Sequence, residues 1–442
     1  MKKCFNWAFV AIILILGLTL GLGTVLFGPS QPAANEQLSA APVWTDKDGN
    51  WNADFLSDTM TWFSDHFFLR QELISTGNWL KAKLLGTSGA DSVLLGKDGW
   101  LYYTDTVEDY TGAHPLTDRE LFCIANNLAL LAEYAENTGK DFLFTVAPNK
   151  NALYPDNMPD LGATAVQTDA ERLYALLDRM DVPYADLHEV FRGEEETLYF
   201  KHDSHWNSKG AALGADVINA AFGVDSDYFS ADFSTMESHS GDLYEMLYPA
   251  FADPERNPVY GGKLDFAYTT GATKPDSITL QTRGQGSTTL LAYRDSFGNL
   301  LYPYLANSYA DARFSRSTVY DLTLEADHIL IELVERNLRY LITYLPVIAS
   351  PVRDISVPTE RAGTISVRFE NGKAPEGCVR ITGSPEIAPD AESEVYVICG
   401  GTAYEALLHS DGGFAAYVPE EAQPEAVVYS VGGAYKLFSA DK

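Results

Sequence analysis

The chain is poor in cysteine and in positive charge. Its 442 residues include four cysteines, which are too few and too scattered for a disulfide scaffold or a CxxC metal site. Cys378 and Cys399 lie in one C-terminal segment, where they could form a disulfide outside the cell or remain two free thiols. Lysine and arginine total 31 against 61 aspartates and glutamates, a formal net charge of −30. Because such a surface repels phosphates, the composition argues against nucleic acid as a partner.

The sequence also lacks internal repeats of fixed period. What it has instead is ample material for folded cores, with 46% apolar and 12% aromatic residues. A chain of this length and composition favours two folded domains over one. Residues 29–50, which contain three prolines and small polar residues, are expected to form a linker ahead of them.

A long apolar run opens the chain. Residues from Phe5 to Gly28 carry no charge, and a helix of this length crosses about 30 Å of hydrocarbon. Lys2 and Lys3 precede the run and indicate that the N-terminus lies inside. We therefore predict a single-pass anchor over residues 1–28 in the cell membrane, with the bulk of the chain extracytoplasmic. A cleaved secretory signal is the alternative, and it exports the same residues.

Strands alternate with helices over residues 51–350. Capping boxes at Thr117–Glu120 and Thr168–Glu171 predict the starts of two helices. Apolar runs typical of buried strands are found at Asp141–Ala147, Val182–Leu187, Thr288–Tyr293 and His328–Leu333. This alternation predicts a doubly wound α/β layer with a mostly parallel sheet and helices on both faces. After Pro351 short β-rich runs separated by turn residues predict a small all-β domain over residues 351–442.

Two short stretches carry residue types suited to nucleophilic catalysis. Asp203 and His205 are two apart, so in an extended segment both side chains point the same way and the carboxylate can orient the ring. Ser296 follows a predicted buried strand, at the edge where α/β sheets bind ligands. The alternatives are that Asp203 and His205 only cap a helix, that Ser296 only caps the next, or that His202 joins the pair as a metal site. Since no further dense His/Asp cluster completes such a site, we predict no metal and no cofactor.

A family resemblance rests on six short motifs in order. They are Phe67-x-x-Arg70, Gly96–Leu101, Pro148–Lys150 with Tyr154-Pro155, Asp203-x-His205-Trp206-Asn207, Asp295–Phe297 and Glu332-x-x-Glu335-Arg336. Over residues 55 to 340 this pattern resembles the SGNH-hydrolase-like alginate O-acetylation (AlgX/AlgJ) family and the related DHHW proteins of Gram-positive bacteria. The resemblance implies a circularly permuted, flavodoxin-like SGNH fold, with Ser296 as nucleophile, His205 as general base and Asp203 as its orienting partner.

The resemblance also suggests residues around this triad. Asn149 or Tyr302 could donate to the oxyanion, and Trp206, Lys150 and Arg294 are candidate substrate contacts. The family usually has glycine where this chain has Arg294. That cation could narrow the acyl pocket, bind an anionic substrate or signal lost activity.

The implied function is a membrane-anchored O-acetyltransferase or acetylesterase acting on an extracellular polysaccharide. If acetyl transfer is right, a multi-span membrane acyltransferase is the expected partner that delivers the acetyl group. The alternative is a catalytically degenerate, glycan-binding scaffold of a cell-envelope complex, which Arg294 favours.

Overall fold

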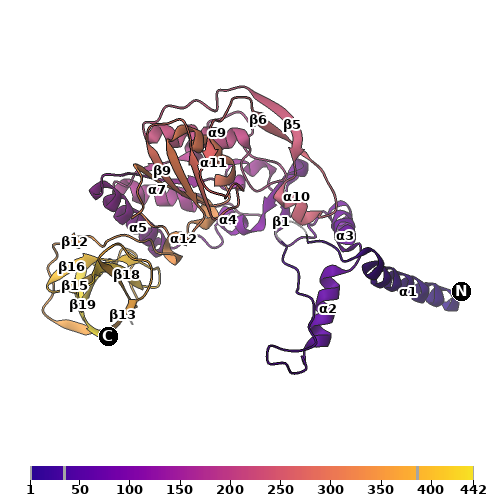
Figure 1. The fold of residues 1–442 in the computed structure, drawn as a ribbon, viewed down its shortest axis with the longest axis horizontal. Coiled ribbons are helices and arrows are strands. Elements are labelled where there is room, and N and C mark those ends of the chain that lie inside the picture. Colours follow the sequence, from indigo (N-terminus) through magenta and orange to yellow (C-terminus); the bar gives the residue numbers. More distant parts are fainter. Residues whose placement is uncertain (1, 33–35, 385–387, 442) are drawn as a thin grey trace.

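The centre of the molecule is a seven-stranded sheet covered by helices on both faces (Figure 1). The computed structural model describes residues 2–32, 36–384 and 388–441. In spatial order the strands of this sheet are β4 (Tyr184–Ala185), β3 (Asp141–Ala147), β11 (His328–Val334), β9 (Thr289–Arg294), β10 (Asp311–Ser315), β8 (Thr279–Arg283) and β7 (Ala267–Tyr268). The first five are parallel, β8 pairs antiparallel to β10, and β7 pairs antiparallel to β8 at the edge of the sheet.

Two cores form because the central strands are apolar on both faces. On one face, Phe144 and Ile331 pack with α5 (Asp118–Asn137) and α7 (Asp169–Arg179). On the other, Leu143 and Leu330 pack with α8 (Leu187–Arg192), α9 (Ser208–Ala221) and α11 (Gly298–Ser308). Both predicted capping boxes are present at the starts of α5 and α7. The predicted α/β fold is therefore confirmed.

The other helices and a short hairpin precede the sheet in the sequence, connect its strands or follow its last strand. They are α1 (Lys2–Phe27), α2 (Phe55–His66), α3 (Arg70–Leu85), the hairpin of β1 (Val93–Leu95) and β2 (Leu101–Tyr103), α4 (Val107–Thr111), α6 (Lys150–Leu153), α10 (Asp242–Leu247) and α12 (Tyr340–Thr343). The antiparallel pair β5 (Phe233–His239) and β6 (Glu255–Tyr260) forms an arm beside α10 (Figure 1).

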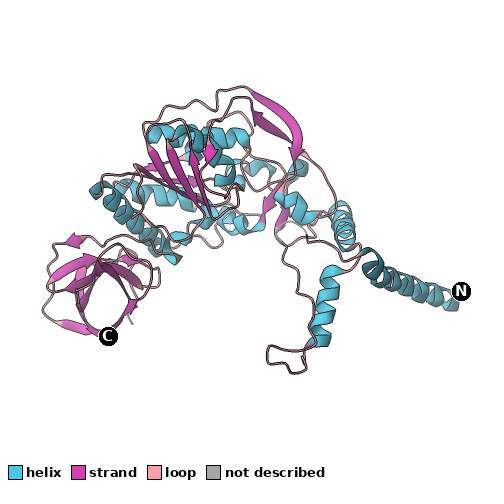
Figure 2. Cartoon of the chain, viewed as in Figure 1, coloured by secondary structure: helices cyan, strands magenta, loops and turns pink. Residues whose placement is uncertain are grey.

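A β-rich region completes the chain, as predicted (Figure 2). Its nine strands follow the spatial order β12 (Val352–Arg353), β16 (Thr402–Glu405), β15 (Val395–Cys399), β19 (Pro424–Val431), β20 (Ala434–Asp441), β13 (Arg361–Glu370), β14 (Cys378–Gly383), β18 (Phe414–Pro419) and β17 (Leu407–Leu408). Cys378 and Cys399 are not joined by a disulfide. The residue boundaries of the predicted domains stay a prediction.

The predicted transmembrane anchor is not confirmed. Over the described ranges, the structure contains no helix with both the length and the apolarity needed to cross a membrane. Part of the prediction lies outside the described residues, namely Met1 and several side chains within α1.

Asn127 of α5 joins the α/β layer to the C-terminal sheet. Its buried amide donates to the carbonyl oxygens of Leu341 at 3.1 Å and Leu408 at 3.0 Å, and it accepts from the backbone N–H of Leu408 at 2.8 Å. The core on this face continues into the C-terminal sheet through residues such as Tyr417. These contacts fix β17 against α5.

We expect Asn127→Leu to lower the free energy of unfolding by about 2–4 kcal/mol, because it leaves a buried N–H group and two buried carbonyls without a partner. Urea unfolding followed by circular dichroism measures the change. Asn137→Leu, at the exposed end of the same helix, is the control and should change stability by less than about 0.5 kcal/mol. Equal effects of the two substitutions would contradict the structural role of Asn127.

Candidate active site

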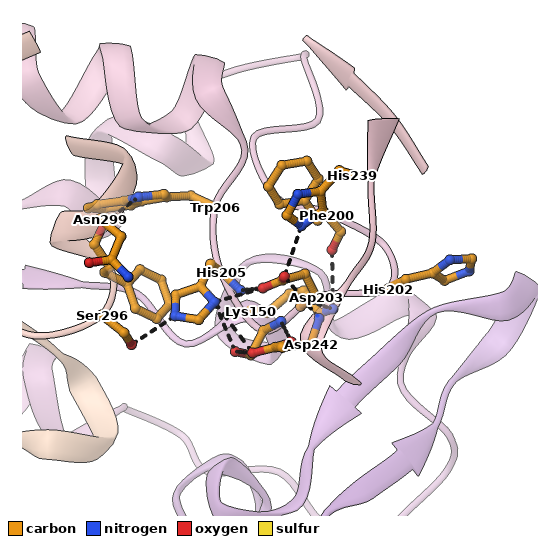
Figure 3. A network of polar contacts seen from close by, with 12 residues as sticks. Lys150, Phe200, His202, Asp203, His205, Trp206, His239, Asp242, Ser296 and Asn299 are labelled. Atoms are coloured by element: carbon orange, nitrogen blue, oxygen red, sulfur yellow. Dashed lines mark hydrogen bonds and ion pairs between the residues drawn. The ribbon is translucent and has the colours of Figure 1, made fainter. Parts of the chain in front are cut away.

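Two loops carry the predicted catalytic residues to one place (Figure 3). Asp203 and His205 lie in the loop before α9, which Asn207 caps by accepting from the backbone N–H groups of Lys209 and Gly210. Ser296 lies between the end of β9 and the start of α11. Because β9 is a central parallel strand, its carboxyl end presents Ser296 at the edge where such sheets bind ligands.

A chain of hydrogen bonds connects these three side chains. His205 Nδ1 lies 2.7 Å from Asp203 Oδ1, and His205 Nε2 lies 2.8 Å from Ser296 Oγ. The ionised carboxylate accepts only, so Nδ1 carries the proton that it receives and Nε2 can accept from the serine hydroxyl. The structure thus brings Asp203, His205 and Ser296 together in the arrangement that acyl transfer requires, while their catalytic roles stay a prediction.

Asp295 fixes the turn that presents Ser296. Its Oδ1 accepts from the backbone N–H of Phe297 at 2.9 Å. Its Oδ2 accepts from the backbone N–H of Val334 at 2.8 Å and from Asn337 Nδ2 at 2.7 Å. The carboxylate therefore ties the turn after β9 to the end of the neighbouring strand β11.

Two residues that sequence reasoning missed complete the surroundings of Asp203. His239, the last residue of β5, approaches Asp203 Oδ2 with Nε2 at 2.9 Å, and its ring stacks on Phe200 at 3.7 Å between centroids (Figure 3). The backbone N–H of Asp242 donates to the same oxygen at 3.1 Å. No local sequence pattern predicted either residue, because the β5–β6 arm and the segment within it bring them to the site only in the folded chain.

In this cluster, burial and the neighbouring groups shift the pKa values of Asp203 and His205 in opposite directions. Burial alone would raise the pKa of Asp203, but the hydrogen bonds of His205 and His239 outweigh it and hold that pKa well below its ordinary value. Burial likewise lowers the pKa of His205, yet the hydrogen bond and charge of Asp203, with the charge of Asp242, raise it overall above 6.5, against a smaller lowering effect of Arg336.

Asp203, His205 and Asp242 are close enough to hold a metal ion. Their atoms already have protein partners, however, since Asp242 Oδ2 accepts from the Ser204 hydroxyl at 2.6 Å and His205 bridges Asp203 and Ser296. His202, the alternative metal ligand, points away from the cluster and packs against Tyr244 (Figure 3). The donor set therefore suits a proton relay better than a metal site.

The structure does not bring the two predicted oxyanion donors to Ser296. The Asn149 amide donates to Asp109 Oδ2 at 2.9 Å, and Tyr302 of α11 shares a hydrogen bond of 2.7 Å with Tyr268 of β7. Neither lines the cavity at Ser296. Asn149 follows the central strand β3, whose carboxyl end faces the site, but its side-chain amide is hydrogen-bonded to Asp109 and not directed at Ser296.

Two of the predicted substrate contacts, Lys150 and Trp206, are buried and hydrogen-bonded within the protein. Lys150 is buried, and its Nζ donates to the carbonyl oxygens of Phe200, Lys201 and Asp203, the last at 2.6 Å. Burial lowers the pKa of Lys150 to about 8. Trp206 is fully buried and donates from Nε1 to the carbonyl oxygen of Phe297 at 3.0 Å. Both residues hold the loop of Asp203 and His205 in place and neither lines the cavity at Ser296, so a contact with substrate stays a prediction.

Arg294 lines the cavity at Ser296, but both terminal nitrogens of its guanidinium donate within the protein. Its guanidinium donates to the carbonyl oxygens of Pro275 at 2.6 Å and Asp295 at 3.1 Å and to Asn299 Oδ1 at 2.6 Å. Burial lowers its pKa to about 10. Its side chain passes over Gly298, where an added Cβ would lie 2.2 Å from Arg294 Cδ. The bulky side chain at position 294 is thus accommodated by a glycine four positions later.

Ser296 and His205 open onto a cavity of about 1080 Å³. Its lining combines acidic, basic and aromatic residues, among them Asp242, Asp276, Arg316, Arg336 and Tyr340. A larger cavity, of about 1290 Å³, lies between α5, the start of β3 and the C-terminal sheet and contains none of the predicted site residues.

We expect NMR titration of the His205 ring to give a pKa above 6.5, because the charge of Asp203 outweighs burial. The unprotonated base would therefore be lost as the pH falls through that raised value. His239→Phe should raise the pKa of His205 further, since Asp203 then has one imidazole partner in place of two. His239→Gln, which keeps a donor, is the control and should cause a smaller rise. A His205 pKa at or below 6.5 would contradict stabilisation of the imidazolium by Asp203.

Comparison with known proteins identifies the family that this site resembles. Residues 93–259 match the model of the SGNH hydrolase-like domain of acetyltransferase AlgX. The match includes Asp203 and His205 and confirms the resemblance seen in the sequence. At the family level it indicates an acyl-transfer enzyme. No curated protein matches the chain.

Three solved structures are distantly similar to this chain. Bacillus cereus PatB1 is 18% identical, covers 56% of this chain and 98% of its own, and gives a TM-score of 0.43. A DHHW family protein from Eubacterium siraeum is 16% identical, with 55% and 95% covered and a TM-score of 0.41. The O-acetyltransferase domain of Pseudomonas putida AlgJ is 17% identical, with 56% and 92% covered and a TM-score of 0.38.

Proposed function

Starting from the match of residues 93–259 to the AlgX SGNH hydrolase-like domain, we propose that this chain is an extracytoplasmic O-acetyltransferase or acetylesterase that acts on a polysaccharide. The observation that carries the proposal is the hydrogen-bonded chain from Asp203 through His205 to Ser296, which opens onto a cavity at the carboxyl edge of the sheet. The extracytoplasmic location rests on the apolar run at the N-terminus.

The proposed reaction proceeds in two half-reactions. Ser296 Oγ attacks the acyl carbonyl carbon while its proton passes to His205 Nε2, and the electron pair of the C=O bond moves onto the carbonyl oxygen. When that pair returns, the bond to the leaving alkoxide breaks, and His205 gives the alkoxide its proton. A sugar hydroxyl or water then attacks the acyl-serine through the same steps, and Ser296 leaves with its hydroxyl restored.

The surroundings of His205 suit this role. Asp203 holds Nδ1 protonated, so Nε2 is free to accept, and the same carboxylate stabilises the imidazolium that forms. Hydrogen bonds of Lys150 and Trp206 hold the loop that carries Asp203 and His205, and this limits the orientations open to the His205 ring. Phe297 packs against His205 with ring centroids 4.7 Å apart, on the side next to Ser296.

Acetyl transfer to a sugar requires room for an acceptor beside the acyl-serine. A cavity of about 1080 Å³ with many polar groups in its lining offers that room and suits a hydroxyl-rich ligand better than an apolar one. For transfer we further propose that a multi-span membrane acyltransferase delivers the acetyl group. The internal hydrogen bonds of Arg294 support the enzyme over the degenerate scaffold, because its guanidinium is tied to Pro275 and Asn299 rather than to Ser296.

We expect a fluorophosphonate probe to label Ser296 of the full chain, and p-nitrophenyl acetate to be hydrolysed. Ser296→Ala should abolish labelling and lower kcat/KM by a factor on the order of 10³ or more, because the nucleophile is lost. Intact-protein mass spectrometry and initial rates measure the two effects.

The matched control is Ser317→Ala, which removes a hydroxyl from the lining of the same cavity. Its labelling and hydrolysis should stay within about twofold of the unmodified protein, since Ser317 only accepts from the backbone N–H of Val319. An unlabelled Ser296 together with no hydrolysis would reject the enzyme and favour the glycan-binding scaffold.

A further inference from the structure

An acyl-transfer site needs donors for the negative charge that develops on the carbonyl oxygen. Removing one such donor typically lowers kcat by roughly 10²–10³-fold. The side chains predicted for this task, Asn149 and Tyr302, are hydrogen-bonded elsewhere. In the described part of the chain the backbone N–H of Ser296, just before α11, has no hydrogen-bond partner and can serve as one donor. Neither predicted side chain can therefore donate to the carbonyl oxygen in this arrangement.

Arg336 is placed to supply it. The residue lies in the short 3-10 helix η4 (Glu335–Asn337), directly after the central strand β11. Its guanidinium carbon is 5.4 Å from the ring centroid of Phe297 and 5.3 Å from that of Tyr103. Arg336 lines the same cavity as Ser296 and His205, and Phe297 contacts both Arg336 and His205.

Arg336 differs from the other arginines of this cavity because its guanidinium has no polar partner within the described residues. Arg294 donates to carbonyl oxygens and Asn299, Arg316 pairs with Asp276 at 3.0 Å, and Arg339 pairs with Glu120 at 3.2 Å. Over the described residues, the guanidinium of Arg336 makes no hydrogen bond and no ion pair, and it lies over the rings of Tyr103 and Phe297. Its donors are therefore available to a ligand.

The elements around Arg336 also fix its position. The neighbouring carboxylate of Glu335 is turned away from it into a buried cluster, where it accepts from the backbone N–H of Ala170 at 3.2 Å and contacts His188 at 3.3 Å. Asn337 donates to Asp295, the residue that orders the turn of Ser296. The same short segment thus joins Arg336 to the nucleophile's support.

We propose that Arg336 is a catalytic residue that donates hydrogen bonds to the acyl carbonyl oxygen while that oxygen carries the negative charge of the tetrahedral intermediate. The inference rests on the proposed function and names the missing part of its site. A guanidinium suits the task because it stays charged and offers several donors in one plane. The contacts of the guanidinium with the rings of Tyr103 and Phe297 use none of its donors.

The test compares Arg336→Met and Arg336→Lys with the full chain, using p-nitrophenyl acetate as substrate. This ester carries no negative charge, so recognition of an anionic acceptor does not contribute to the result. We expect kcat to fall by roughly 10²–10³-fold in Arg336→Met with KM changed less than about threefold, and Arg336→Lys to recover part of the loss. Arg336→Ala should regain activity when ethylguanidinium is added, which a purely structural role would not produce.

Arg339→Met is the matched control, because Arg339 lines the same cavity but already pairs with Glu120. Its kcat should stay within about twofold of the unmodified protein. Unchanged ester hydrolysis in Arg336→Met would overturn the inference, as would a loss confined to transfer onto an anionic acceptor. An unmodified chain that neither hydrolyses the ester nor labels at Ser296 overturns the proposed function and the inference together, whereas an active chain with an unaffected Arg336 variant overturns the inference alone.

Discussion

The buried carboxylate of Asp203 is the constraint on which the site depends. A buried charge is tolerated only when hydrogen-bond donors surround it, and here the donors come from three separate segments. They are the backbone N–H and ring of His205 in its own loop, His239 at the end of β5, and the backbone N–H of Asp242 at the start of α10. Satisfying this one charge therefore sets the positions of the base, the β5–β6 arm and α10 together.

The parallel sheet explains why the other functional groups meet at the same edge. Strands β3, β9 and β11 are neighbours that run in one direction, so the residues that follow each of them emerge side by side. Lys150 follows β3, Ser296 follows β9 and Arg336 follows β11. Asp295 then connects two of these ends by hydrogen bonds to Phe297 and Val334.

Local patterns predicted the parts of this arrangement that local chemistry determines. Capping boxes and apolar runs located the helices and strands, and the spacing of Asp203 and His205 predicted their mutual contact. The sequence could not place His239, because its approach to Asp203 depends on the tertiary path of an antiparallel arm. Nor could it assign Asn149 or Lys150, since a polar side chain at a strand's end can either line a cavity or bond to a neighbouring loop.

The side chains at positions 294 and 298 compete for the same volume. The arginine side chain passes through the volume that a methyl group at position 298 would fill. Related sequences should therefore vary at these positions in a correlated way. Arginine at position 294, in the conformation seen here, is compatible with glycine at position 298 and clashes with any residue there that carries a Cβ.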